Sequence, residues 1–214
     1  MCQSTKSMPT VTFDQLAPST IAFADAPTVK GCRTHVEITC ENKQVPIVQL
    51  AKPDAPLRIP FGLYSPYGDE EGNQRHTLDV SAPPELAAWA ADLDEQLVQH
   101  AIKHSGAWFG RSLDEATVRA MHHPLVTPSD RFDPLLRLKA SPKAVKLWRA
   151  ADRAPATVDE LVRDAAVVPL VTLGHVWILD DGSLFGLTLG MKAALVAPSL
   201  GLDAFVGLEP MEEE

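Results

Sequence analysis

The sequence predicts an α+β fold whose β part is mainly antiparallel, with one long packed helix and short accessory helices. Short segments of period two, separated by turn residues, occupy both ends of the chain. A period near 3.6 appears only in the middle. The 18 prolines outnumber the 12 glycines and are spread throughout, which excludes a helical bundle or coiled coil. A small Greek-key barrel is the economical arrangement, and an open sandwich is its alternative.

Composition sets the class of protein before any motif is considered. The 214 residues are 45% hydrophobic and 22% charged, as in ordinary globular proteins. We expect an N-terminal extension over 1–27, a barrel domain over 28–200 and an acidic tail over 201–214. No apolar run reaches the roughly 18 to 20 residues of a membrane span, and Met1–Pro9 lacks a signal-peptide core. These features predict a soluble, intracellular protein, whose three cysteines (Cys2, Cys32 and Cys40) stay reduced.

The first 80 residues are expected to form strands. The central prediction is a hairpin of Thr34–Cys40 with Val45–Ala51, in which Pro46 places the second strand at a sheet edge. The other expected strands are Thr10–Phe13, Thr20–Ala24, Leu57–Tyr64 and His76–Val80.

Three helices are expected after these strands. Apolar residues recur every three or four positions from Pro84 to His104, with Pro84 suited to the first turn. A second helix begins at Ser112, where Ser112 and Glu115 have capping-box spacing, and ends before Pro124. A third follows Thr157. The apolar positions of the long helix are Leu86, Trp89, Ala90, Leu93, Leu97 and Ala101.

Strands resume at Leu135–Ala140 and end in a hairpin. His175–Leu179 leads through an Asp-Gly turn into a strand that begins at Phe185. The residues expected on its core face are Phe185, Leu187, Leu189, Met191, Ala193 and Leu195. Between them lie Gly186, Thr188, Gly190 and Lys192, whose glycines serve either sheet curvature or the close approach of a ligand or backbone.

Charge is distributed unevenly along the chain. Residues 1–102 carry a balance of −6, residues 103–153 of +5 and residues 154–214 of −8, within a total of −9. The chain closes on the acidic segment Glu209–Glu214. A basic centre between acidic blocks indicates either a polyanion site that the tail can occupy or scattered surface charge.

Enzyme signatures are absent from the sequence. It contains no phosphate-binding loop, dinucleotide fingerprint, nucleophile elbow or zincin helix, and no cofactor is expected. Adjacent His122 and His123 point about 100° apart on a helix, so a helix end explains them better than a shared metal. The acidic cluster Asp69-Glu70-Glu71 lacks the spacing of a calcium loop and is expected to be solvated.

The basic centre carries the remaining chemistry. Arg137 and Lys139, two apart in a strand, leave the same face while Leu136 and Leu138 enter the core. Lys143, Lys146 and Arg149 follow around Trp148. Cations beside aromatic rings are what a single nucleic-acid strand requires, because phosphates need neutralising and bases stack. Trp89, Trp108 and Phe109 are assigned to the core, and the available platforms are Trp148, Trp177, Phe61 and Tyr64.

The order of several segments resembles a known family. The segments that come first are Pro56–Leu63, the polar loop, His76–Val80 and the helix that bears Leu93-Asp94 and ends in Ser105–Phe109. The likeness continues through Leu135–Lys139 to the closing Val176–Ile178 and Phe185–Thr188. Together, over roughly residues 45–196, they resemble the single-stranded DNA-binding proteins of nucleocytoplasmic large DNA viruses and some protists, which are similar to acidic-tailed podophage proteins.

The resemblance implies an OB-fold barrel, no catalysis and action in the nucleus or at a viral replication site. It also implies a C-terminal tail that contacts replication proteins and competes with DNA. Two alternatives remain open: an interaction module that has lost nucleic-acid binding, and a small enzyme using His35, His76 or His175. DNA or RNA preference, viral or cellular origin, and a homodimer as against a single chain also remain open.

We therefore predict non-catalytic binding of single-stranded nucleic acid. The phosphate contacts are assigned to Arg58, Arg137, Lys139, Lys143, Lys146, Arg149 and Lys192, and the base contacts to Tyr64, Trp148 and Trp177.

Overall fold

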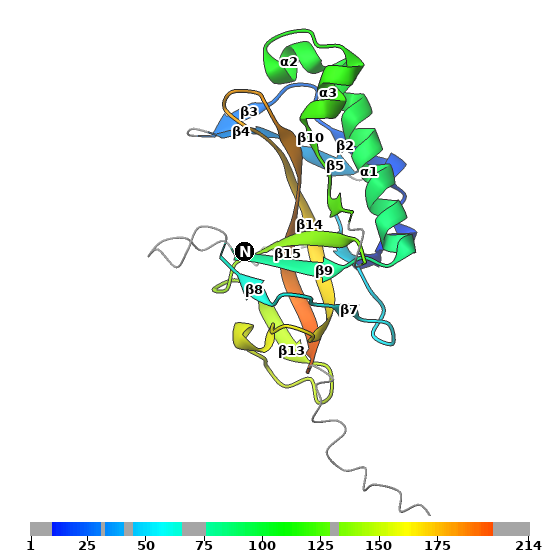
Figure 1. Cartoon of the computed structure of the whole chain (residues 1–214), viewed down its shortest axis with the longest axis vertical. Helices are drawn as coiled ribbons and strands as arrows, with labels where there is room; N and C mark the ends of the chain where they lie inside the picture. The colour runs from blue at the N-terminus through cyan, green and yellow to red at the C-terminus, as the bar shows by residue number, and fades with distance from the viewer. Residues whose placement is uncertain (1–9, 31–32, 41–44, 66–75, 129–132, 199–214) are drawn as a thin grey trace, which may run out of the picture.

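A long antiparallel hairpin forms the axis of the molecule. Its strands are β14 (Ala166–Ile178) and β15 (Phe185–Ala197), which run along the long dimension of the computed structural model (Figure 1). The structure describes residues 10–30, 33–40, 45–65, 76–128 and 133–198. The sequence predicted this hairpin but only the last part of its first strand.

Each strand of the hairpin carries a succession of shorter strands along its outer edge. β15 pairs in parallel with β10 (His122–His123), β12 (Leu135–Ala140) and β13 (Lys146–Arg149). β14 pairs antiparallel with β4 (Arg33–Val36), β6 (Ile47–Gln49) and β7 (Leu57–Arg58). The remaining strands of this sheet are β1 (Thr10–Thr12), β3 (Thr28–Lys30), β8 (Leu63–Tyr64), β9 (His76–Ser81) and β11 (Val126–Thr127).

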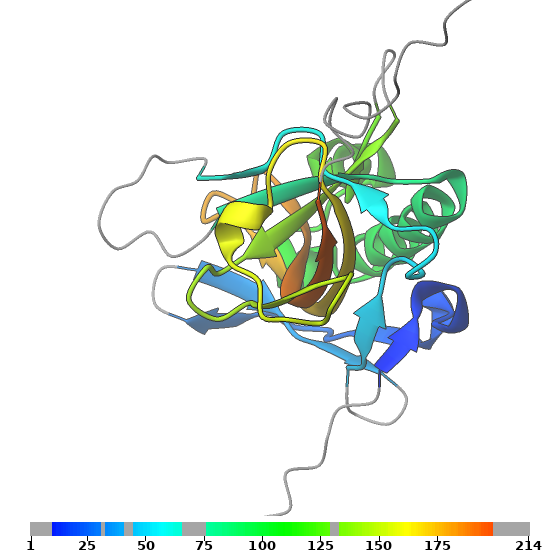
Figure 2. The ribbon, with the colours of Figure 1, turned by 90° about the horizontal axis from the view of Figure 1, so that it is seen from below.

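The resulting sheet is mixed and strongly curved. Its main path runs β1-β6-β14-β15-β12-β9-β8, and no pair of described strands joins β1 to β8. Figure 2 shows the lower strands curving around the core. A predominantly β fold is confirmed, whereas a closed Greek-key barrel is not.

The predicted hairpin between Thr34–Cys40 and Val45–Ala51 is wrong. The first segment splits into β4 and β5 (Ile38–Cys40), and β5 pairs with β2 (Ile21–Phe23) in a separate two-stranded sheet. β6 lies between β1 and β14 instead of at an edge. Pro46 precedes β6 and removes no donor from its ladder. Non-local partners therefore override the local hairpin pattern.

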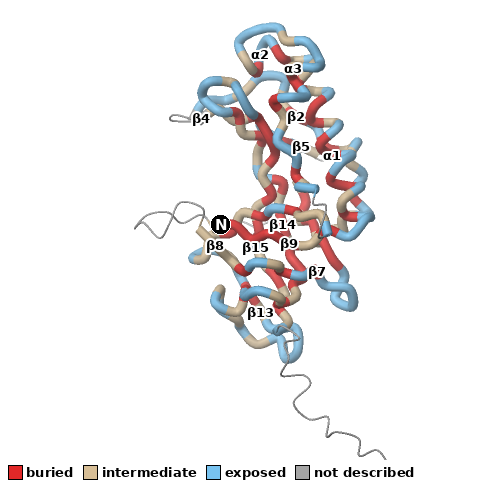
Figure 3. The backbone as a smooth tube through the Cα atoms, in the orientation of Figure 1, coloured by how far each residue is buried: buried red, intermediate tan, exposed pale blue. Residues whose placement is uncertain are grey.

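The long helix α1 (Pro84–Lys103) agrees with the prediction. All six of its predicted core positions are buried, and Pro84 occupies the first turn. α1 packs along the upper half of the molecule, where Figure 3 shows its inner face buried. The Nε1 of Trp89 donates to the carbonyl of Leu16, at 2.9 Å, and thereby ties the N-terminal segment to the helix.

The shorter helices depart from the prediction in their bounds. α3 (Glu115–Met121) is capped by Asp114, whose carboxylate accepts from the Thr117 amide, so the predicted cap at Ser112 is wrong. His122 follows the end of α3, as expected for a helix end. The third predicted helix is a single 3-10 turn, Val158–Glu160. A further helix, α2 (Ser105–Phe109), was not predicted.

A bulge in β15 changes which residues face the core. Leu187, Leu189 and Met191 are buried as predicted. Val171 pairs with Met191 but Leu170 pairs with Ala193, so Lys192 is an extra residue. Beyond it Ala194 and Val196 are buried, and the predicted core positions Ala193 and Leu195 are only partly buried.

Several sequence predictions fall outside the described residues or are untested. The acidic loop Asp69-Glu70-Glu71, Cys2, Cys32 and the tail lie outside them. Cys40, the last residue of β5, is partly buried. The boundaries at residues 27 and 200 stay predictions. In the part of the chain that the structure describes, no helix is long and apolar enough to cross a membrane.

Candidate nucleic-acid interface

Four lysines converge where β12 ends and β13 begins. Lys139 of β12 pairs with Gly190, and Lys146 of β13 pairs with Ala193, three residues further along β15. This offset is about 10 Å along the strand. Lys143 lies in the turn between the two strands, and the bulged Lys192 lies between their two partners on β15. We call Lys139, Lys143, Lys146 and Lys192 the lysine cluster.

Most of the lysine cluster is exposed and lacks a carboxylate partner. Lys143, Lys146 and Lys192 are exposed, and none of them forms an ion pair with a described residue. Lys139 is partly buried, and its Nζ donates to Thr77 Oγ1 at 2.9 Å across the β9–β12 pair. Positive charge therefore collects along one edge of β15.

A buried carboxylate organises the adjoining part of the same sheet. Asp79 is 4% exposed and lies directly opposite Arg137 in the β9–β12 pair. It accepts hydrogen bonds from Arg137 Nε, at 3.0 Å, and from the Tyr64 hydroxyl, at 2.8 Å. The side chain of Arg137 is nevertheless 46% exposed, so part of its guanidinium faces solvent.

This contact shifts two pKa values. Burial, followed by the hydrogen bond to Asp79 and its charge, raises the pKa of Tyr64. The hydrogen bond to Asp79 likewise raises the pKa of Arg137. The phenol therefore stays protonated and donating at neutral pH, and the guanidinium stays charged. Tyr64 and Arg137 are held in place by one acceptor.

β15 carries no side chain at Gly190, the residue that pairs with Lys139. A Cβ placed on Gly190 would meet nothing closer than Thr172 Oγ1, at 3.6 Å. Neighbouring Thr172 and Thr188 are partly buried. A flat group can therefore approach the backbone of β15 here without displacing a large side chain.

Trp148 is the aromatic residue nearest the lysine cluster along the chain. It alternates with buried Leu147 in β13, pairs with Leu195 of β15 and is only partly buried. One predicted stacking residue thus lies two positions beyond Lys146 on the same strand.

Three predicted site residues lie elsewhere or are engaged. Arg149 forms an ion pair with Glu160, at 3.1 Å. Arg58 of β7 forms an ion pair with Asp164 on the other side of the hairpin. Trp177 lies four β15 positions from Gly190, with ring carbon Cζ2 2.9 Å from where a Gly186 Cβ would stand. These residues are separate from the lysine cluster or already neutralised.

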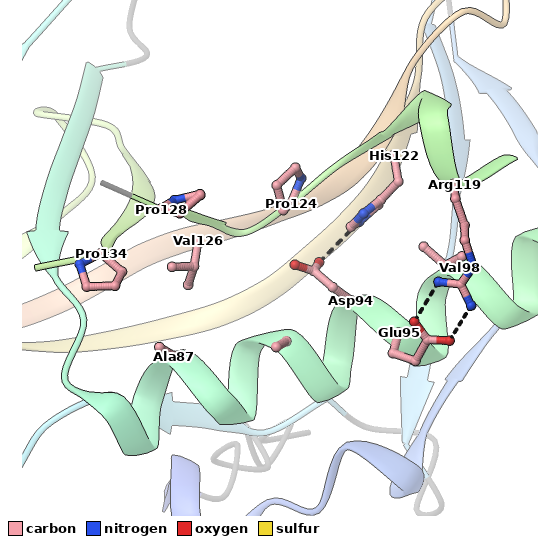
Figure 4. Close-up of a pocket in the computed structure, with 11 residues that line it drawn as sticks. Ala87, Asp94, Glu95, Val98, Arg119, His122, Pro124, Val126, Pro128 and Pro134 are labelled. Carbon is pink, nitrogen blue, oxygen red and sulfur yellow. Dashed lines mark hydrogen bonds and ion pairs between the residues drawn. The ribbon is translucent and has the colours of Figure 1, made fainter. Parts of the chain in front are cut away.

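A second candidate site is the pocket between α1 and the chain around β10 and β11 (Figure 4). Its volume is about 350 Å³. His122 Nε2 lies 3.3 Å from Asp94 Oδ1. The other carboxylate oxygen of Asp94, Oδ2, accepts a hydrogen bond from the Leu125 amide at 2.8 Å. Arg119 and Gln99 hold the pKa of Glu95 at about 2 through hydrogen bonds. Among the described residues that line this pocket there is no Ser, Thr, Cys or Lys.

The histidines proposed for an enzyme do not reproduce this geometry. The rings of His35 and His175 meet edge to face, with their centroids 4.2 Å apart, and His76 begins β9. No role was predicted for Asp79 or Asp94, and their contacts with Tyr64, Arg137 and His122 were not predicted. In each case the partner comes from a distant segment, and only the pairing of strands and helices brings the two together.

Comparison with known proteins adds one distant similarity. No family model matches the sequence, and no curated protein matches it. A solved structure of gp2.5, a single-stranded DNA-binding protein encoded by bacteriophage T7, has a TM-score of 0.45 and 9% identity. The match covers 74% of this chain and 93% of that chain. At these values the likeness does not establish a shared function, and membership of the viral and protist family stays a prediction.

Proposed function

We propose that the protein binds single-stranded nucleic acid, without catalysis, on the surface formed by β8, β9, β12, β13 and β15. The lysine cluster is the observation that carries the proposal, because three of its exposed members, Lys143, Lys146 and Lys192, form no ion pair with a described residue in a chain of net charge −9. Tyr64 and Arg137 extend this surface along β8 and β12. Lysines neutralise phosphates without any demand on sequence.

The proposed ligand path follows the face of the sheet that carries Arg137, Lys139 and Gly190. Phosphates contact the lysine cluster and Arg137, and bases stack against Tyr64 and Trp148 or lie over Gly190. Base stacking is worth roughly 1–3 kcal/mol per base and tolerates any sequence. DNA, in replication, recombination or repair, is the ligand that we propose. The tail's contacts with replication proteins and a homodimeric assembly are further proposals from the sequence.

The test is a fluorescence anisotropy titration of a labelled thymidine oligomer over a range of salt concentrations. If four of these five cations contact phosphates, the slope of log affinity against log salt is expected near −3, from about −0.7 per phosphate. Replacing Arg137 and Lys139 together by Gln is expected to weaken binding and make the slope shallower by about 1.4. Neutral amides are preferred to charge reversal because Arg137 faces buried Asp79.

A matched control removes two cations at the opposite end of the molecule. Lys103→Gln with Arg111→Gln changes net charge equally but lies beside α2, far from β8 and β9 (Figure 1). The control is expected to keep the wild-type slope. If both double variants lost the same amount of oligonucleotide affinity, the loss would be explained by net charge alone. A salt-independent affinity would remove the phosphate model and favour the interaction-module alternative.

A further inference from the structure

Three potential metal ligands meet at the C-terminal end of α1. His104 Nε2 lies 3.2 Å from Asp25 Oδ1, and His100 Nε2 lies 3.6 Å from the same oxygen. The three ligand atoms all lie within 4.8 Å of one another. Asp25 follows β2, so the ligands come from segments about 75 positions apart in the sequence.

The two imidazole nitrogens are buried without a hydrogen bond. Among the described residues, neither His100 Nε2 nor His104 Nε2 has a hydrogen-bond partner, and both atoms are shielded from solvent. A buried nitrogen without a hydrogen bond is unfavourable, because the hydrogen bond that it would form with water is lost. The Asp25 side chain is 77% exposed, so an ion can reach the cluster from solvent.

The surrounding packing holds the three ligands. His100 and His104 are four positions apart on one helix face, with their rings stacked at a centroid distance of 4.3 Å. The rings of Phe23 and Trp108 pack against the His100 ring, with centroid distances of 5.8 and 5.4 Å. Trp108 Nε1 also donates to the carbonyl of Ala24, at 3.2 Å, which positions the residue before Asp25.

We propose that Asp25, His100 and His104 form a binding site for one divalent transition-metal ion of the zinc class. Zinc binds imidazole nitrogen at about 2.0–2.1 Å and carboxylate oxygen at about 2.0–2.2 Å. In a tetrahedron of that size the ligand atoms are about 3.3–3.6 Å apart, which matches the two distances to Asp25. Three protein ligands leave the fourth position to water.

The chemistry of the ligand set favours this ion over calcium or magnesium. Imidazole suits zinc, copper, iron and nickel, whereas calcium and magnesium prefer oxygen ligands. A bound ion would join the segment after β2 to the end of α1.

The test is isothermal titration of Zn²⁺ into the full chain at pH 7.5, with circular dichroism of every variant. One equivalent is expected to bind the wild type. His104→Gln and, separately, Asp25→Asn are each expected to weaken that binding by at least tenfold. His123→Gln removes an exposed histidine outside the cluster and is the matched control, expected to keep wild-type affinity.

Further outcomes decide the proposal in either direction. Zn²⁺ is also expected to raise the unfolding temperature of the wild type and of His123→Gln, but not of His104→Gln. If His104→Gln fails to fold, Asp25→Asn decides, because that carboxylate is exposed. Failure of the wild type to bind Zn²⁺, or unchanged binding in the Asp25 and His104 variants, overturns the proposal. Either result leaves the nucleic-acid proposal untouched, since the lysine cluster contains none of these residues.

Discussion

The carboxylate of Asp79 shows how one buried residue can fix two surface side chains. It receives the Tyr64 hydroxyl on one oxygen and Arg137 Nε on the other. A carboxylate that is 4% exposed needs such partners, because an unpaired buried charge is strongly unfavourable. The position of the tyrosine ring at the surface is therefore a consequence of burying the acid.

Two substitutions at Tyr64 separate its ring from its hydroxyl. Tyr64→Phe keeps the ring and is expected to lower the free energy of unfolding by about 0.5–1.5 kcal/mol while leaving oligonucleotide affinity unchanged. Tyr64→Ala is expected to weaken binding by about 1–3 kcal/mol as well. Urea unfolding and anisotropy titration measure the two effects. A folded Tyr64→Ala protein with wild-type affinity would remove Tyr64 from the interface.

At the scale of elements, the two glycines of β15 do different things. Gly186 admits close contacts: a Cβ there would stand 2.9 Å from both the His123 carbonyl oxygen and the Trp177 ring. Gly190 leaves an open surface. The sequence analysis offered curvature and close approach as alternatives, and at Gly186 the approach is by another strand and a tryptophan.

Alanine substitution distinguishes these two roles. Gly186→Ala is expected to destabilise the fold by about 1–3 kcal/mol, because backbone and a packed ring must shift. Gly190→Ala has ordinary contacts only and is expected to be neutral or slightly stabilising, since alanine is favoured over glycine in a strand. Denaturant midpoints measure both. Equal midpoints for the two variants would contradict this interpretation.

The elements also show which features local sequence could predict. α1 and β12 were predicted to within one residue because helix periodicity and alternation are local. The pairing of β5 with β2 and of β6 with β14 was not, because it depends on distant partners. β14 was underestimated, since Pro169 and Gly174 interrupt its pattern. His100 and His104 were not singled out from the sequence, and Asp25 joins them only in the folded chain.

For the whole molecule, the distribution of charge matters more than the total. Lys139 and Lys146 lie on strands that pair with β15, the strand that carries Lys192. Arg58 and Arg149 form ion pairs with Asp164 and Glu160. The role of the predicted residues in binding stays a prediction. Alternation could place Arg137 and Lys139 on one face. It could not reveal which cations had carboxylate partners, because those partners come from other segments.

Deletion of Glu209–Glu214 tests competition between the tail and the ligand. These residues contribute four negative charges and lie outside the described structure. A tethered acidic segment acts at high effective concentration, so the deletion is expected to raise oligonucleotide affinity several-fold at about 20 mM salt. At high salt, screening should abolish the difference. Equal affinities at low salt would show that the tail only solvates the chain terminus.

The bulge at Lys192 shifts the alternation of inward and outward residues in β15 by one position. One extra residue exchanges the inward and outward positions of everything that follows it. The four residues after the bulge are all apolar, so their types suit either the core face or the outer face of the strand. They are Ala193, Ala194, Leu195 and Val196. In this part of β15, the number of residues up to the bulge therefore helps to set which residues face the core, in addition to their type. Single insertions or deletions near residue 192 would therefore alter the surface beside β13 more than they alter the composition of the core.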